Sequence, residues 1–363
     1  MNDESYIKLS LELAKKGSGK VSPNPLVGSI IVKGDKIVGA GFHERFGGKH
    51  AEINAIEACK ESLEGATLFS NLEPCSHFGK TPPCVDRIIK EKIKRVVIGT
   101  LDPNPLVGGK GIKKLKDAGI EVKVGVLPEA CIQLNKFFFK FVNKNLPYVT
   151  LKAAQTIDGK IADAGGFSNW ISSVPSRNYV HQLRASYDGV LIGSGTVERD
   201  DPKLTVRLVE GRNPKRIVLD TNLKLNLHHK IFAGNRDKNL ILITSRASVK
   251  KHKKLHQLKS KGVKIIFVRK KKNGLLDLKD VLSELAELNI TSILVEGGSR
   301  VFTSFIKEDL FDEMLLFVSP SILGNGIQII GNLGIKRLNR AVKLEIKSAE
   351  KIGDDCLIEL IKN

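Results

Sequence analysis

Residues 74–84 read Pro-Cys-Ser-His-Phe-Gly-Lys-Thr-Pro-Pro-Cys, and residues 50–52 upstream read His-Ala-Glu. His50 and Cys84 each stand where a helix is expected to begin, and Cys75 follows an expected strand. One imidazole and two thiolates give a tetrahedral zinc ion three ligands and leave the fourth position for water. Such an open site is typical of catalysis, because zinc lowers the pKa of a bound water toward neutrality. The stretch therefore predicts one zinc ion per chain, held by His50, Cys75 and Cys84.

Glu52 follows His50 by two residues, which on a helix gives the two side chains different directions. It can lie beside the metal-bound water and act there as general acid and base. Cys84 directly follows two prolines at a helix start, where the helix dipole favours a thiolate. A closed structural zinc site, or three unrelated residues, is the alternative interpretation of this pattern. His77 is expected to be a loop residue, with contact to substrate or metal as its alternative.

Strand and helix patterns alternate around this stretch, which predicts an α/β unit. The expected strands cover residues 26–32, 66–72, 95–99 and 121–126, and the expected helices cover 51–60, 84–93 and 130–142. A short polar break at residues 143–147 ends in Pro147, which indicates a domain boundary there. The chain is accordingly predicted to form two domains, residues 1–145 and residues 146–363. Cys59, Cys131 and Cys356 lie in apolar elements and are expected to be core residues.

The second half repeats the alternation and predicts a largely parallel sheet covered on both faces, with antiparallel strands late in the chain. The expected strands cover residues 148–154, 189–193, 216–219, 239–244, 264–268, 292–295, 313–318 and 356–361, and the expected helices cover 175–187, 278–288 and 299–307. Gly193 and Gly195, and Gly297 and Gly298, stand between an expected strand and a helix or turn. Their backbone N–H groups could hold phosphates. A plain strand-to-helix turn is the alternative.

Composition sets further bounds. The chain has 363 residues, of which 41% are hydrophobic and 27% are charged, so it is expected to be globular. Its formal net charge is +20. Its lysines are spread along the sequence and its aromatics do not alternate with them, which favours a generally basic surface over a nucleic-acid footprint. A phosphorylated substrate would also benefit from a positive field. We expect no nucleic-acid partner, no membrane association and no signal peptide. The five cysteines show no disulfide pattern, so we expect a cytoplasmic protein.

The motifs carry a resemblance. Zinc nucleobase deaminases have two residues between their ligand cysteines, whereas eight separate Cys75 from Cys84. The longer stretch, together with Ser-Pro-Asn-Pro-Leu-Val-Gly at residues 22–28, resembles the pyrimidine deaminases of riboflavin biosynthesis over residues 1–145. The resemblance implies a cytidine-deaminase-like three-layer domain. It also implies contacts of Asn24, His43 and Ala51 with the pyrimidine or ribose, and of Lys80 with the 5′-phosphate.

The second half resembles the reductases of the same pathway, which have a dihydrofolate-reductase-like fold. The resemblance rests on residues 152–162, 193–197, 200–207 and 296–298, and the chain departs from the usual Met-Ser with Gln155-Thr156. It implies an NADPH site formed by Ala154, Trp170, Thr196, Asp200, Asn222, Gly298, Ser299, Arg300, Val301, Phe302, Thr303 and Ser304. It implies substrate contacts from Ser168, Arg184, Leu204, Arg207 and Glu296. Each has a structural alternative: Trp170 in the core, Arg184 on a solvated face, Asp200 in a turn.

Together the resemblances imply one bifunctional enzyme. A zinc-activated water would remove the 2-amino group of 2,5-diamino-6-ribosylamino-4(3H)-pyrimidinone 5′-phosphate, with Glu52 moving the protons. NADPH would then reduce the ribosyl group to ribityl, giving 5-amino-6-ribitylaminouracil 5′-phosphate. The partner is thus a small phosphorylated pyrimidine, and a homo-oligomer is expected. The alternatives are a deaminase acting on RNA and a basic nucleic-acid-binding protein that keeps enzyme folds.

Overall fold

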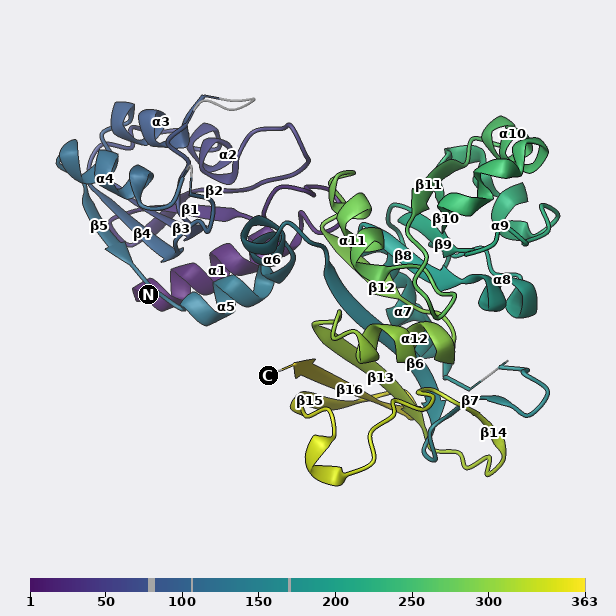
Figure 1. Ribbon diagram of the computed structural model, residues 1–363. Helices are drawn as coiled ribbons and strands as arrows, with labels where there is room; N and C mark the ends of the chain where they lie inside the picture. Colours follow the sequence, from purple (N-terminus) through teal and green to yellow (C-terminus); the bar gives the residue numbers. More distant parts are fainter. Residues whose placement is uncertain (78–81, 106, 169–170, 363) are drawn as a thin grey trace. The chain divides into compact units, whose positions relative to one another are not determined.

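The computed structural model describes residues 1–77, 82–105, 107–168 and 171–362. The chain divides into two compact units, Met1–Asn145 and Leu146–Asn363 (Figure 1). Among the described residues, no helix is both long and apolar enough to cross a bilayer.

The first unit is built on a sheet of five described strands in the order β2-β1-β3-β4-β5. β1 is antiparallel to both β2 and β3, whereas β3, β4 and β5 run parallel. The strands are β1 (Gly28–Lys33), β2 (Lys36–Phe42), β3 (Thr67–Leu72), β4 (Arg95–Thr100) and β5 (Glu121–Val124). The helices are α1 (Asp3–Lys15), α2 (Ala51–Glu57), α3 (Cys84–Lys90), α4 (Lys110–Asp117), α5 (Pro128–Leu134) and α6 (Lys136–Lys144).

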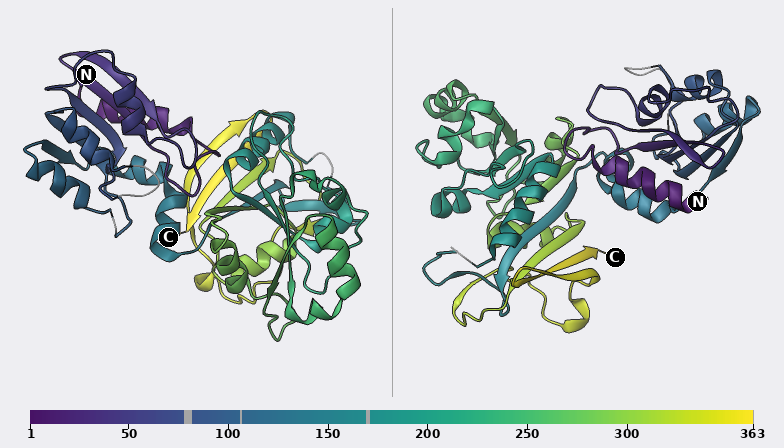
Figure 2. Two further views of the ribbon diagram at one scale, coloured as in Figure 1. Left: turned by 90° about the horizontal axis from the view of Figure 1, so that it is seen from above. Right: turned by 180° about the vertical axis from the view of Figure 1, so that it is seen from behind.

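Helices cover both faces of this sheet, so the unit has three layers. α1 and α5 lie side by side on one face, and α2, α3 and α4 lie on the other (Figures 1 and 2). Successive strand residues alternate between the two cores, because side chains on a strand point to opposite faces. Ile30 packs with α1, whereas its neighbour Ile31 packs with α2 and α3. Burial on both sides explains the apolar runs at residues 30–32 in β1 and 96–98 in β4.

All but one of the predicted elements of the first unit are present, and the structure adds others. The single helix expected over 130–142 is wrong: it is two helices, α5 and α6, separated at Asn135. Asn135 is buried, and its side-chain amide bonds to the backbone of Leu26 at 2.7 and 2.9 Å. A side chain that satisfies distant backbone groups thus overrides the local helical pattern. The sequence reading also missed α1, α4 and β2.

The second unit has a sheet of nine described strands in the order β11-β10-β9-β8-β12-β6-β13-β16-β15. From β11 to β13 all neighbours are parallel, and β16 and β15 add antiparallel pairs at one edge. This confirms the predicted mixed sheet. A separate ribbon joins β7 (Lys160–Asp163) and β14 (Gly326–Gln328). The strands of the main sheet are β6 (Tyr148–Thr156), β8 (Gly189–Gly193), β9 (Lys215–Leu219), β10 (Leu240–Ser245), β11 (Lys264–Val268), β12 (Ser292–Val295), β13 (Glu313–Ser319), β15 (Leu344–Ile352) and β16 (Asp355–Lys362).

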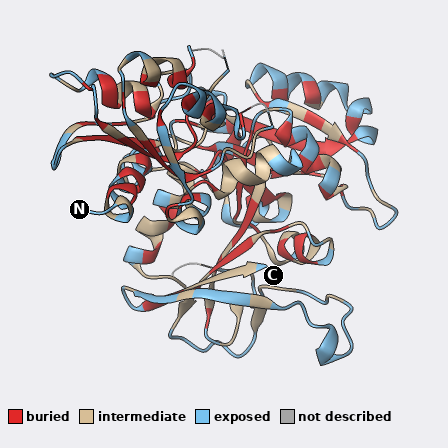
Figure 3. Cartoon of the chain, turned by 90° about the vertical axis from the view of Figure 1, so that its left-hand side faces the viewer, coloured by how far each residue is buried: buried red, intermediate tan, exposed pale blue. Residues whose placement is uncertain are grey.

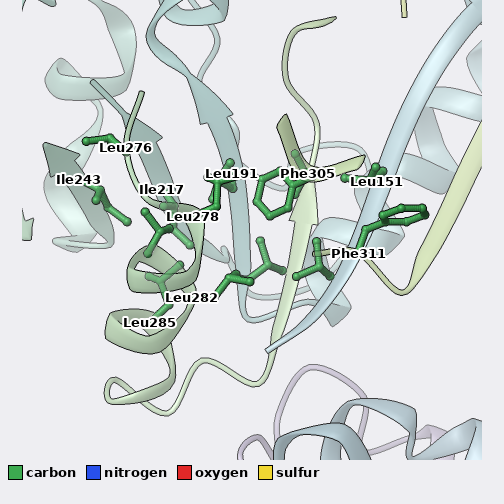
Figure 4. Packing of buried hydrophobic residues seen from close by; sticks show 14 of the residues in the cluster. Leu151, Leu191, Ile217, Ile243, Leu276, Leu278, Leu282, Leu285, Phe305 and Phe311 are labelled. Carbon is green, nitrogen blue, oxygen red and sulfur yellow. The ribbon is translucent and has the colours of Figure 1, made fainter. Parts of the chain in front are cut away.

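Helices again lie on both faces of the sheet. They are α7 (Val174–Ser186), α8 (Ser194–Asp200), α9 (Lys230–Ala233), α10 (His252–Ser260), α11 (Leu278–Ala286) and α12 (Ser299–Lys307), with short 3-10 turns at 235–237, 246–250 and 338–340. Leu282 and Leu285 of α11 and Phe305 of α12 pack on one face, against Leu151, Leu191 and Ile217 (Figure 4). Val180 of α7 packs on the other face with Phe317. The central strands are the most buried part of each unit (Figure 3).

Strands β7, β14 and β15 and helices α8, α9 and α10 were not predicted from the sequence. β15 is exposed along most of its length, so it lacks the apolar alternation that marks a half-buried strand. α10 begins within the lysine-rich run at 250–254, where the charges obscure the two buried leucines, Leu255 and Leu258. The glycine-rich segment at 193–196 is not an open turn, because α8 begins at Ser194 directly after β8.

Candidate active sites

The three predicted metal ligands converge in the first unit. His50 is the residue before α2, Cys75 lies three residues after β3, and Cys84 is the first residue of α3. His50 Nδ1 lies 3.5 Å from Cys75 Sγ and 3.3 Å from Cys84 Sγ. The usual zinc–sulfur and zinc–nitrogen bond lengths place two ligand atoms of a tetrahedral ion about 3.5 Å apart. The donor set and its spacing therefore fit zinc through Nδ1 and two sulfurs.

The two ligand sulfurs have different hydrogen-bonding surroundings. The thiol of Cys84 donates to Cys75, and His50 adds a further hydrogen bond, which together lower the pKa of Cys75 to about 4. The first backbone N–H of α3 also points at Cys75 Sγ, at 3.4 Å, and not at its own sulfur. Donation to Cys75 and burial raise the pKa of Cys84. The N-terminus of α3 thus stabilises negative charge on the sulfur of Cys75, through the backbone N–H of Cys84.

Glu52 lies beside the cluster on the first turn of α2. It is buried, and its Oε2 is 3.6 Å from Cys84 Sγ. Burial raises the pKa of this carboxyl to about 7, a rise that the nearby His50 opposes. A carboxyl that titrates near neutrality can both take and return a proton under working conditions. The position and the pKa both suit a proton shuttle.

A pocket of about 270 Å³ opens next to the cluster and holds Asn24 and His43 in its wall. His43 Nδ1 lies 2.9 Å from the carbonyl of Lys49, so it is the protonated nitrogen, and Nε2 accepts from the Asn24 amide at 3.1 Å. Burial lowers the pKa of His43, which keeps the ring neutral. The Asn24 carbonyl oxygen is left available to a ligand.

Ala51 and Lys80 are the remaining residues that were expected to contact the substrate of this unit. Ala51 is fully buried outside the pocket lining, so only its backbone could reach a substrate. Lys80 falls outside the described residues. His77 does line the pocket, as its alternative interpretation allowed. Cys131 is in the core as predicted, whereas Cys59 and Cys356 are only partly buried.

The sequence reading missed an acid that shapes this pocket. The buried Glu73, directly after β3, accepts backbone N–H groups from Asp102, Gly109, Gly111 and Ile112 at 3.0–3.4 Å. It thereby fixes the segment that follows β4, whose Asp102 and Asn104 line the pocket. Its position immediately after an apolar strand was the one available signal.

The second unit has a larger cleft, of about 1130 Å³, at the carboxyl ends of β9, β8, β12 and β6. Most residues predicted for the cofactor and substrate line it together: Ala154, Thr196, Asp200, Asn222, Gly298, Ser299, Arg300, Val301, Phe302, Ser304, Ser168, Arg184, Arg207 and Glu296. Leu204 is buried behind the lining, and Thr303 turns away to bond Gly331 N at 2.8 Å. Trp170 falls outside the described residues.

An ion pair lies at one end of the cleft. Arg184 Nε and Nη2 donate to the two carboxylate oxygens of Glu296, at 2.6 and 2.7 Å. Arg184 is therefore not on a solvated helix face. Burial alone would raise the pKa of Glu296, but Arg184 and Lys152 outweigh it, so this pKa is lowered and the acid stays ionised.

Lys152 and His181 complete this end of the cleft, and the sequence reading missed both as site residues. Burial lowers the pKa of Lys152, while Glu296 opposes the change. Burial and the cation Arg184 lower the pKa of His181 to about 4, so the ring is neutral. His181 Nδ1 accepts from Arg207 N at 3.0 Å, which leaves Nε2–H as the donor. A lysine inside an otherwise apolar strand was a usable signal, because buried lysines are rare.

Comparison with known proteins supports both halves. Residues 147–358 match the family model of the RibD C-terminal domain, and residues 1–100 match that of the cytidine and deoxycytidylate deaminase zinc-binding region. The riboflavin biosynthesis protein RibD of Aquifex aeolicus is 46% identical over 98% of this chain and 97% of its own length. The RibD of Escherichia coli is 36% identical over 99% of this chain and 100% of its own.

Solved structures agree. A Thermotoga maritima protein, described as a diaminohydroxyphosphoribosylaminopyrimidine deaminase/5-amino-6-(5-phosphoribosylamino)uracil reductase, superimposes with a TM-score of 0.88 at 40% identity, covering 99% of both chains. The RibD of Acinetobacter baumannii gives a TM-score of 0.89 at 33% identity over 99% of both chains. These likenesses confirm the predicted α/β class, with a deaminase-like first unit and a reductase-like second unit.

We expect purified protein to contain one zinc ion per chain and a Cys75→Ser, Cys84→Ser double variant to contain almost none, since His50 alone cannot hold the ion. Metal analysis by mass spectrometry measures this. Cys356→Ser, in the second unit, is the matched control and should keep its zinc. Full zinc content in the double variant would disprove the ligand assignment.

Proposed function

Because this chain belongs to the RibD family of bifunctional riboflavin biosynthesis proteins, we propose that its two compact units carry the two reactions separately, residues 1–145 the deamination and residues 146–363 the reduction. The protein is a zinc-dependent deaminase and an NADPH-dependent reductase. The observation that supports the division is that each unit has its own core and its own cleft lined by its own residues.

In the first unit we propose 2,5-diamino-6-ribosylamino-4(3H)-pyrimidinone 5′-phosphate as the substrate. Asn24 would accept a hydrogen bond from the ring through its free carbonyl oxygen, because His43 holds its amide nitrogen. His50, Cys75 and Cys84 would hold zinc, which when bound activates a water for attack on the carbon that bears the amine. Glu52 would take a proton from the attacking water and pass it to the amino group, which leaves as ammonia.

In the second unit the ribosyl group of the deaminated product would be reduced to ribityl. NADPH when bound supplies the hydride, and the protein supplies orientation and charge. The Arg184–Glu296 pair and Ser168 would hold the substrate at the β6 and β12 end of the cleft. The segments at 194–196 and 298–300 begin α8 and α12, so their backbone N–H groups would face the cofactor's phosphates.

Glu52→Gln in the full-length chain should keep its zinc and lose about 10²–10⁴-fold in deamination, because the amide cannot carry a proton. It should still reduce supplied deaminated intermediate at the normal rate. Product analysis with each substrate measures both activities. Glu57→Gln, on the exposed side of the same helix, is the matched control. If Glu52→Gln abolished reduction in a folded protein, the two sites would not be independent.

Gly195→Asp should weaken the binding of NADPH and of NADH alike, by about tenfold or more, because it places a carboxylate beside the pyrophosphate. A Cβ atom at this position would meet no atom within 4 Å, so the fold should tolerate a small side chain there. Calorimetric titration gives the two dissociation constants. Gly195→Ala fills the same space without charge and should bind both cofactors as the parent does. Unchanged affinities in Gly195→Asp would show that the cofactor binds elsewhere.

We also propose a homo-oligomer assembled through the second unit. Its sheet ends at β15, whose edge can pair with another chain, and Ile346 on that strand is 65% exposed. Leu338 nearby in sequence is 90% exposed. Light scattering should show a multimer that Ile346→Lys dissociates. Ile37→Lys, in the first unit, should leave it intact, and a monomeric parent chain would refute the proposal.

The cytoplasm is the proposed location. The proposal is supported by five free cysteines, two of them close together in the metal site, because thiols persist in a reducing compartment. Cell fractionation with an antibody against the chain would test the proposal, and recovery outside the cytoplasmic fraction would refute it.

A further inference from the structure

The far end of the reductase cleft lies at the loop after β9, residues 220–225. β9, β8, β12 and β6 are neighbours in that order, so this loop stands three strands away from β6, roughly 14 Å at the usual strand spacing. Under the proposed function the nicotinamide lies at the β6 end and the phosphates lie at α8 and α12. The adenosine half of an extended dinucleotide then reaches the β9 loop. Leu275 and Leu276 line the cleft there and offer an apolar wall to the adenine.

The acid at the start of this loop is already engaged. Asp220 is 2% exposed and its Oδ2 accepts Leu225 N at 2.9 Å, while its carbonyl oxygen accepts Leu223 N. In dinucleotide sites that favour NADH, an acidic side chain accepts a hydrogen bond from the 2′-hydroxyl of the adenosine ribose. Asp220 cannot take that role without releasing its own loop.

The charged side chains around the β9 loop that could meet the adenosine ribose are lysines. Lys224 is exposed, lines the cleft, and its ammonium has no hydrogen-bond or ion-pair partner within the described part of the chain. Lys251 donates to the carbonyls of Asn222 and Leu223, at 2.8 and 3.4 Å, and so holds the loop while adding a second positive charge. Lys254 is a third cation close to both Lys251 and Asp220.

We propose that Lys224 binds the 2′-phosphate of NADPH, and that Lys251 positions the loop which presents it. A phosphate dianion is the group that this arrangement of lysines fits, and it is the only chemical difference between NADPH and NADH. The β9 loop would therefore set the preference between the two cofactors. The inference rests on the proposed placement of NADPH in this cleft.

The test is calorimetric titration of full-length protein with NADPH and with NADH, without substrate. Lys224→Ala should bind NADPH about tenfold or more weakly, the scale of a lost hydrogen bond between charged groups, while its affinity for NADH stays within about twofold. Lys224→Arg should restore most of the preference. Lys250→Ala removes an exposed lysine that does not line the cleft, and should change neither affinity.

A second pair of ligands isolates the phosphate. Adenosine 2′-monophosphate should bind the parent chain more tightly than adenosine 5′-monophosphate does, and Lys224→Ala should remove that difference. An equal loss for NADPH and NADH, or no loss for either, would overturn the role of Lys224. Such a result, together with weakened binding of both cofactors in Gly195→Asp, would overturn this inference alone. Unchanged binding in Gly195→Asp would instead overturn the proposed placement of the cofactor.

Discussion

Parallel strands can be joined only by a crossover, so their carboxyl ends gather at one edge of the sheet and the following helices begin there. Both clefts of this protein lie at such an edge. In the first unit β3 delivers Glu73 and Cys75, and β4 delivers Asp102. In the second unit β6, β8, β9 and β12 all end in the same cleft. Residues more than a hundred positions apart in the sequence, such as Lys152 and Glu296, thereby become neighbours.

The segments that follow the strands at this edge need hydrogen bonds from side chains, because they are not paired with a neighbouring strand. Glu73 provides one by accepting four backbone N–H groups from the segment after β4. Asp220 does the same for the β9 loop through Leu225 N. Both acids are buried beside a site, and each accepts backbone hydrogen bonds that hold the neighbouring segment. A buried carboxylate near a cleft is therefore better judged by its partners than by its burial.

The sequence predicted what local pattern and motif carry. His50, Cys75 and Cys84 were assigned from ligand type and helix starts, and the structure brings them together. Patterns failed where distant contacts decide the outcome. Asn135 interrupts a helical run because it bonds to Leu26, which no local rule contains. No sequence pattern marked His181 as a site residue. Its orientation in the cleft depends on a hydrogen bond from Arg207 N, which belongs to another segment. Lys152 did give a signal as a lysine within a predicted strand, but its proximity to Glu296 and Arg184 depends on how other segments pack.

Part of the chain's positive charge lies in the reductase cleft, where it can attract phosphorylated ligands. Cationic side chains that line the cleft outnumber acidic ones: Lys152, Arg177, Arg184, Arg199, Arg207, Lys224 and Arg300 against Glu198, Asp200, Asp220 and Glu296. Glu296 is neutralised by Arg184, and His181 adds no positive charge because its pKa is about 4. Low-dielectric walls focus such a field onto whatever enters the cleft. A concave positive site suits small, multiply phosphorylated ligands such as NADPH and a nucleotide-like phosphate. A protein that binds a nucleic-acid duplex would instead need its basic side chains on an open face.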